Sequence, residues 1–144
     1  MIRSFEPGDV PELLRLTRQL HDEGVVRRLK FDAQALLQSF QRPGLFVELA
    51  FDGEEAVGLC TGFVEQTFFG PDLVAHQHLF YVVPSHRGGI LAARMMHRFE
   101  TWALLQGAKE VWVSQATGIR PERTRKLFEA LGFGTVGFIA RKAV

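Results

Sequence analysis

The stretch YVVPSHRGGILAARMMHRFETWALLQG, residues 81–107, begins as an apolar strand, turns through Pro84 and Arg87-Gly88-Gly89, and continues as a long helix with no acidic residue before Glu100. The first backbone N–H groups of a helix lack intrahelical partners, and the helix dipole adds partial positive charge there. Adjacent glycines add no side chain that would keep a bulky anion away. The stretch predicts a phosphate-binding turn or, as the plain alternative, a tight turn with a solvated arginine.

Two familiar phosphate-binding loops do not match this turn. A P-loop requires G-x-x-x-x-G-K-[ST], and the chain contains no Gly-Lys-Ser or Gly-Lys-Thr. A dinucleotide fingerprint requires alternating glycines after a first strand, whereas Gly88 and Gly89 are adjacent. These patterns argue against a P-loop nucleotide hydrolase and a Rossmann dehydrogenase.

The composition bounds the class of protein. A chain of 144 residues, 47% hydrophobic, predicts one domain over residues 1–144. Its net charge of +1 offers no general attraction to nucleic acid or to an anionic membrane. Cys60 is the only cysteine, which excludes an intrachain disulfide and fits a reducing compartment. The N-terminus lacks an apolar signal core, and no apolar run reaches the roughly 18 residues of a membrane span. We expect a soluble, cytoplasmic protein with neither nucleic acid nor membrane as partner.

Hydrophobic periodicity predicts the element order β-α-α-β-β-β-α-β-α-β. A helix starts at EPGD, and Asp32 caps a second, short helix that ends before Pro43. Two more helices run to about Gln106 and from about Pro121 to Leu131. The expected strands are residues 2–6, 45–51, 56–69, 73–83, 110–116 and 134–142. The fourth and fifth flank the third helix, and ligands favour the carboxyl ends of strands joined in this way.

Two motifs in this order resemble the GNAT superfamily of acyl-coenzyme A-dependent N-acetyltransferases. The first motif is a strand ending V-x-P, then x-x-[Q/R]-x-x-G-x-[G/A], then a helix with a Trp-Ala pair that ends at a glycine. It is matched by Val82, Pro84, Arg87, Gly88, Ala92, Glu100, Trp102, Ala103 and Gly107. The second, A-x-x-x-Y-x-x-x-G-F, occurs as TRKLFEALGF, residues 124–133.

The specific resemblance covers residues 76–142 and looks most like uncharacterised acetyltransferases of phages and bacteria. It implies an α/β fold with a mixed, mostly antiparallel central sheet and helices on both faces. It also implies acetyl-CoA as co-substrate, with the pantetheine arm along the backbone of Tyr81, Val82 and Val83. The diphosphate would rest on the N–H groups of Arg87, Gly88, Gly89, Ile90, Leu91 and Ala92, with Phe128 also at the cofactor.

Two positions depart from the family pattern. Ile90 replaces the central glycine of the first motif, and its branched side chain would crowd a diphosphate unless it points elsewhere. Phe128 replaces the tyrosine that would protonate the departing CoA thiolate. That role would fall to Tyr81, Ser114, Thr117 or water, or the thiolate would leave unprotonated.

The general base, which keeps the attacking amine neutral, has three candidates. Strand alternation places His76 and His78 on one face and Gln77 on the other. In some relatives an acidic residue stands six before the proline, which is the position of His78, so His78 ranks first, ahead of Glu65 and Glu23. The alternative for each is a purely structural role. Because His21, Asp22 and Glu23 are contiguous, they cannot converge on a metal from one helix face, and we expect no metal.

The resemblance thus implies transfer of acetyl from acetyl-CoA to a primary amine by direct attack in a ternary complex, without an acyl-enzyme. The alternative is an acyl-CoA-binding module with weak or lost activity, which Ile90 and Phe128 would permit. The acceptor is open among a polyamine, an aminoglycoside-like compound, an amino acid and a protein amine. Its wall is expected from residues 20–45 and 63–75, with Phe68 and Phe69 as an apolar lip. Analogy with relatives suggests a homodimer.

One basic set has two interpretations. It consists of Arg120, Arg123, Arg125 and Lys126, which precede and begin the last predicted helix. In relatives this region approaches the adenosine phosphate of CoA, so the set would bind that group. A solvated helix face is the alternative.

Overall fold

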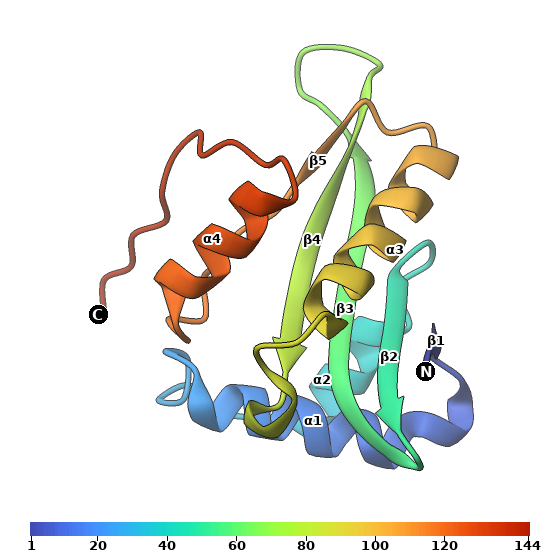
Figure 1. Ribbon diagram of the computed structural model, residues 1–144, viewed down its shortest axis with the longest axis vertical. Coiled ribbons are helices and arrows are strands. Elements are labelled where there is room, and N and C mark those ends of the chain that lie inside the picture. The colour runs from blue at the N-terminus through green and yellow to red at the C-terminus, as the bar shows by residue number, and fades with distance from the viewer.

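The computed structural model describes residues 1–144 and contains a five-stranded sheet (Figure 1). The strands lie side by side in chain order as β1 (Ile2–Ser4), β2 (Phe46–Asp52), β3 (Glu55–Gln66), β4 (Leu73–Val82) and β5 (Glu110–Trp112). Neighbouring strands are antiparallel except β4 and β5, which are parallel. The predicted mixed, mostly antiparallel sheet is confirmed.

Helices cover both faces of this sheet, as predicted. They are α1 (Val10–Glu23), α2 (Ala33–Phe40), α3 (Leu91–Leu105) and α4 (Pro121–Ala130), with single 3-10 turns at Pro7–Asp9 and Pro84–His86. The helix α1 packs on β3 from behind in Figure 1, and α3 packs on β2, β3 and β4 from the front. None of the helices combines the length and hydropathy that a bilayer crossing needs.

The helix positions follow from short-range chemistry. The apolar stripe of α1 is buried at Leu13, Leu16 and Leu20. The carboxylate of Asp32 accepts a hydrogen bond from the Ala35 amide at 3.0 Å, which caps α2 as predicted. Under α3, a Cβ added to Gly62 would overlap the Phe99 ring, so this glycine lets the helix approach β3 closely.

The centre of the core contains the only cysteine. Cys60 is fully buried, and this burial raises the pKa of its thiol to about 12. Since a thiolate is the reactive form, Cys60 is a core residue and no nucleophile. Beside it, Gln77 is buried and its Nε2 donates to Met96 Sδ on α3 at 3.0 Å. This contact fixes which face of β4 turns toward α3.

The two parallel strands separate soon after they meet. They pair only at Val74–His76 against Glu110–Trp112, and beyond these residues β4 pairs with β3 alone. A bulge interrupts the β3–β4 ladder between Cys60 and Gly62, where the Leu79 amide donates to Thr61 Oγ1 at 2.9 Å. Bulges of this kind often lie next to active sites. The separation leaves the carboxyl half of β4 with a free edge.

Two strand predictions at the C-terminal end are corrected. The strand expected at residues 110–116 ends at Trp112, and the one expected at 134–142 is not formed. Residues 134–144 are all exposed, including the apolar Val136, Phe138 and Ile139. A strand pattern becomes a strand only when its backbone finds a partner, and a three-residue edge strand offers little to pair with.

Candidate functional site

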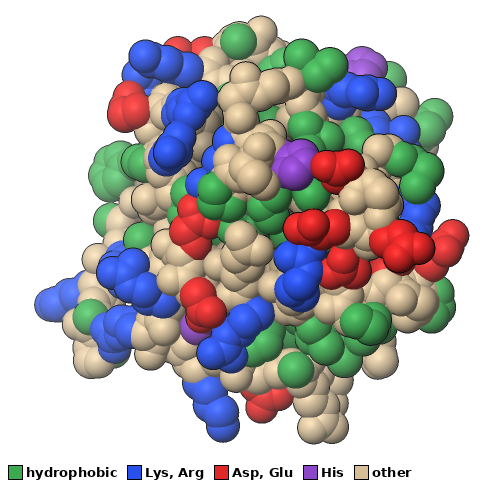
Figure 2. All heavy atoms as spheres, turned by 60° about the horizontal axis from the view of Figure 1, so that its bottom comes forward, with side chains coloured by type: hydrophobic (Ala, Val, Ile, Leu, Met, Phe, Trp, Pro, Cys, Tyr) green, Lys and Arg blue, Asp and Glu red, His purple; other side chains and the backbone are tan.

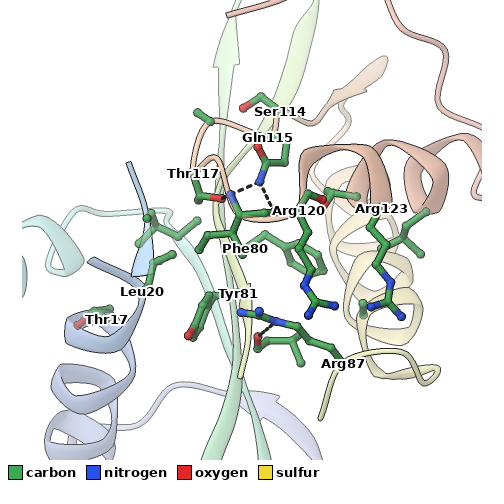
Figure 3. Close-up of a pocket in the computed structure, with 18 of the residues that line it drawn as sticks. Thr17, Leu20, Phe80, Tyr81, Arg87, Ser114, Gln115, Thr117, Arg120 and Arg123 are labelled. Atoms are coloured by element: carbon green, nitrogen blue, oxygen red, sulfur yellow. Dashed lines mark hydrogen bonds between the residues drawn. The ribbon is translucent and has the colours of Figure 1, made fainter. Parts of the chain in front are cut away.

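A cleft of about 610 Å³ occupies the space where β4 and β5 diverge (Figure 3). The carboxyl end of β4 forms its floor, with Phe80 and Tyr81 at the centre. Thr17 and Leu20 of α1 lie on one side, and Arg120 and Arg123 at the start of α4 lie on the other. The volume falls within the range usual for ligand sites, about 300–1,000 Å³.

The turn between β4 and α3 presents unpaired backbone donors to this cleft. None of the N–H groups from Gly88 to Ala93 donates to another protein atom. Gly88, Gly89 and Ala92 line the cleft, and Gly88 has a φ of +88°, which favours glycine. The dipole of α3 adds partial positive charge at the same place. The arrangement suits an oxyanion group such as a phosphate.

Ile90, the departure from the family pattern, does not fill this hollow. Its side chain is 71% exposed and is not part of the cleft lining. Leu91 packs partly against the core instead. Only the backbone of these two residues is therefore offered to a ligand, and the branched side chain leaves the anion position open.

Two arginines of the α4 region reach the cleft without a carboxylate partner. Arg120 and Arg123 line it, and a Cβ on Gly88 would lie 3.2 Å from Arg123 Nη2. Neither forms a salt bridge, whereas Arg125 of the same helix is held by Glu122 and Glu129. The basic set predicted from the sequence therefore divides, with Arg120 and Arg123 at the cleft and Arg125 on the solvated face.

Glu23, one of the predicted bases, is occupied by two partners. Arg87 Nη1 and Nη2 donate to its carboxylate oxygens at 2.8 and 3.0 Å, and the Tyr81 hydroxyl donates to Oε2 at 2.5 Å. The Arg87 hydrogen bonds hold the pKa of the Glu23 carboxyl below its usual value. Arg87 Nε also donates to the Val82 carbonyl at 2.7 Å. This cluster joins the end of α1 to β4 and to the turn.

The other two predicted bases lie in different surroundings. His78 lines the cleft, with its ring edge toward Phe63 at a centroid distance of 6.3 Å. His76 stacks on the same Phe63 ring, so the predicted alternation along β4 holds at these two positions. Glu65 pairs with His76 at 3.0 Å and lies outside the cleft lining. The structure thus brings His78 to the cleft and leaves Glu65 beyond it.

The residues considered for proton donation to the leaving group also line the cleft. Burial, together with the bond to Glu23, raises the pKa of the Tyr81 hydroxyl, which makes it a weak acid. Phe128 is nearly buried, packs on Phe133, and has no proton to give. Ser114 and Thr117 line the cleft and lie above Phe80 in the view of Figure 3. Of the predicted cofactor residues, Tyr81 and Val82 line the cleft, while Val83 is buried and bonded to Val57.

Several lining residues were not predicted individually. They are His21, Val26, Phe31 and Leu36, which come from α1, α2 and the loop between them. They fall within residues 20–45, where a wall was expected, but no residue of 63–75 lines the cleft. Phe68 and Phe69 are fully exposed in the distant β3–β4 loop, so the predicted apolar lip is wrong. No metal-holding group of His, Cys, Asp or Glu side chains is formed.

Known structures share this architecture over the whole chain. An acetyltransferase from Trypanosoma brucei has a TM-score of 0.77 at 19% identity, covering 100% of this chain and 99% of its own. The aminoglycoside N-acetyltransferase AAC(6')-Iy, solved with the bisubstrate analogue CoA-S-monomethyl-acetylneamine, has a TM-score of 0.76 at 18% identity, covering 99% and 98%. An aminoglycoside acetyltransferase from an uncultured soil metagenomic sample has a TM-score of 0.78 at 15% identity, covering 100% and 97%.

At these sequence identities the likeness to solved structures concerns the fold alone. A search of curated proteins by sequence found no match. The sequence profile of the acetyltransferase (GNAT) family, however, matches residues 11–133, which include the whole cleft floor, the turn and both arginines. The chain therefore belongs to the GNAT acetyltransferase family.

Proposed function

We propose that the protein is an N-acetyltransferase that moves acetyl from acetyl-CoA to a primary amine by direct attack in a ternary complex. One observation carries the proposal. The unpaired amides of the turn after β4 and the unpaired Arg120 and Arg123 meet at one end of a cleft that follows the free edge of β4. A diphosphate fits that end, and an extended arm fits the edge.

The residues present fit acetyl-CoA by charge and by space. Gly88 and Gly89 leave room at the turn, and the exposed Ile90 side chain does not compete for it. Arg120 and Arg123 form no salt bridge, unlike Arg125, although the charge of Arg120 contributes to the lowered pKa of Glu23. The Val82 carbonyl faces the cleft, since it accepts from Arg87 there, and would pair with an amide of the pantetheine arm. Acetyl-CoA itself supplies an activated thioester.

His78 is our candidate for the general base. It is the one predicted base that lines the cleft, and it has no carboxylate partner, unlike His76. In the transfer, the amine nitrogen bonds to the acetyl carbon, the carbon–sulfur bond breaks, and the proton lost by nitrogen goes to His78. The sulfur leaves as a thiolate that takes its proton from solvent, because Phe128 cannot donate one and Glu23 holds the Tyr81 hydroxyl.

The absence of an obvious acid favours a second candidate function. In that case the protein binds acyl-CoA as a module and transfers acetyl slowly or not at all. Phe128 at the position of the usual tyrosine is the specific observation in its favour. The two candidates predict the same binding of acetyl-CoA and differ only in turnover.

Two measurements test both candidates. Calorimetric titration with acetyl-CoA should give one binding site, and the absence of binding would sink both. Thiol release in the presence of a panel of amines should exceed the amine-free rate at least about tenfold for the first candidate and by less than that, or not at all, for the second. We also propose a cytoplasmic location, which suits the buried free thiol of Cys60, and a homodimer, by analogy with relatives. Cell fractionation tests the location, and light scattering tests the homodimer.

A further inference from the structure

The end of the cleft opposite the arginines is lined by an apolar wall, which we define as Leu20, Val26, Phe31 and Leu36. Leu20 belongs to α1 and Leu36 to α2, and the loop between these helices supplies the other two. In Figure 3, Leu20 lies across Tyr81 from Arg120 and Arg123. If the arginine end holds the cofactor phosphates, as the proposed function requires, the apolar wall remains for the acceptor.

No carboxylate lines this cleft. Its ionisable lining residues, apart from Tyr81, are His21, His78, His86, Arg87, Arg120 and Arg123. The nearby acids are already paired, since Glu23 binds Arg87, Asp22 binds Arg18, and Glu65 binds His76. A bound ammonium group without a carboxylate loses its hydration and gains nothing in return. The cleft is thus poorly suited to a ligand with several positive charges.

The polar atoms next to the apolar wall are also in use. His21 Nε2 bonds the Leu29 carbonyl at 2.6 Å, and its ring meets the edge of Phe31 at a centroid distance of 5.5 Å. The Arg18 guanidinium covers Phe31 at 5.0 Å. His21 is therefore tied by both contacts to the loop that carries Phe31.

The position of the wall is fixed by contacts across the cleft. The Val25 amide donates to the Thr117 carbonyl at 2.8 Å, and a Cβ on Gly118 would overlap the Val25 side chain. The loop after α1 is thereby held against the loop before α4. This contact bounds the acceptor end and limits the size of the molecule that it admits.

The surface around this end adds to the effect. On the face shown in Figure 2, basic side chains predominate on the left, the side on which α4 and the α1–α2 loop lie in Figure 1. The exposed basic residues of the loop that supplies Val26 and Phe31 are Arg27, Arg28 and Lys30. Such a surface repels a polycation during approach.

We infer that the acceptor is a small molecule with a single primary amine on an apolar body and no second cationic group. This inference rests on the proposed function. It excludes polyamines and aminoglycosides, whose several ammonium groups would find no carboxylate in the cleft lining. Two kinds of compound have one primary amine on an apolar body: a simple hydrophobic amine and an apolar α-amino acid. The amino acid differs by its carboxylate.

Thiol release at saturating acetyl-CoA tests this with four amines: 2-phenylethylamine, phenylalanine, spermidine and kanamycin. We expect kcat/KM for 2-phenylethylamine or phenylalanine to exceed that for both polycations by at least about tenfold. The ratio of kcat/KM for 2-phenylethylamine to kcat/KM for phenylalanine shows whether the acceptor is a simple amine or an amino acid. Faster turnover of spermidine or kanamycin would overturn the inference and leave the proposed function standing. No turnover of any amine would overturn the proposed function and the inference with it.

Substitution in the apolar wall sharpens the test. Phe31→Asp places a carboxylate in the wall and should lower kcat/KM for the preferred monoamine by about tenfold. It should also lower the ratio of kcat/KM for that monoamine to kcat/KM for spermidine. Leu29→Asp is the matched control, because Leu29 is in the same loop, is exposed, and lies outside the cleft lining. Val26→Asp repeats the test at a more exposed wall position, and acetyl-CoA affinity checks folding. The assignment of the wall would be contradicted if Leu29→Asp changed the ratio of kcat/KM for the monoamine to that for spermidine as much as Phe31→Asp and Val26→Asp do.

Discussion

The two ends of the cleft are built in different ways. The end that we propose for the cofactor phosphates, called the phosphate end below, comes from the turn at Gly88–Ala92 and the start of α4 at Arg120–Arg123. It offers backbone donors without a protein partner and two arginines without a salt bridge. The end that we propose for the acceptor, called the acceptor end below, comes from α1, α2 and their loop, where His21 Nε2 bonds the Leu29 carbonyl. The proposed phosphate end is thus specified by short stretches of sequence, which a family motif can describe. The proposed acceptor end is assembled by tertiary contacts between distant segments.

The largest effect should come from His78, the proposed base in the cleft lining. His78→Gln removes the proposed base, so kcat should fall by at least about 100-fold while the Kd for acetyl-CoA changes little. Steady-state thiol release and calorimetry measure the two quantities. His76→Gln is the matched control, because His76 contacts the same Phe63 ring but pairs with Glu65 outside the cleft. A full rate in His78→Gln, or an equal loss in the control, would remove His78 from the mechanism.

The phosphate end predicts the next largest effect. Replacing Arg120 and Arg123 together by Ala should weaken acetyl-CoA binding by about 10–100-fold, because two charge-assisted contacts are lost. Arg125→Ala in the same helix should bind normally, since its guanidinium is held by Glu122 and Glu129. Calorimetric Kd values compare the three proteins. If the double variant bound like the wild type, the phosphates would have to lie elsewhere.

The link between the ends predicts a smaller, pH-dependent effect on stability. Glu23→Gln loses the ion pair with Arg87 and should lower the free energy of unfolding by about 1–3 kcal/mol at neutral pH, between the values for exposed and buried pairs. Because the pKa of Glu23 is lowered in the folded state, its contribution is present above the ordinary value of 4.5 and is lost as pH falls below it.

Urea unfolding of both proteins across this pH range measures the difference. Glu122→Gln is the control, because its carboxylate is exposed and pairs only with Arg125 on the surface. A difference between wild type and Glu23→Gln that grew as the pH was lowered would be inconsistent with the Arg87–Glu23 pair.

The smallest effect concerns the missing acid. Phe128→Tyr restores the usual tyrosine, and we expect kcat to rise by less than about threefold, since a thiolate is already a good leaving group at neutral pH. Single-turnover thiol release measures the change. An increase of about 100-fold would instead show that leaving-group protonation limits the natural enzyme and would favour the weak-activity alternative.

The sequence predicted the cleft lining at the turn after β4 better than the lining of the apolar wall, for a physical reason. The turn is specified by neighbours in the chain, so Gly88, Gly89 and Ala92 could be placed from a motif. The wall residues Phe31 and Leu36 are ordinary apolar residues whose roles arise only when Val25 meets Thr117, a contact between distant segments. Likewise, the ion pair of Glu23 was not predicted, because its partner Arg87 is remote in sequence.

The fold shows the same limit at the chain's end. Residues 134–142 alternate like a strand, but strand formation depends on a partner edge, and β5 ends after Trp112. By contrast, the helix predicted after Asp32 formed where expected, because its cap involves only a neighbouring residue, Ala35. Local chemistry was predictable, and long-range pairing was not.

The most direct test of the central claim is an amide NMR titration with acetyl-CoA. The account predicts large shifts of the Gly88 and Gly89 amide resonances, because these unpaired N–H groups would receive the diphosphate, with no change at Gly44 or Gly53 in turns outside the cleft. Unmoved Gly88 and Gly89 resonances at saturating acetyl-CoA would contradict it.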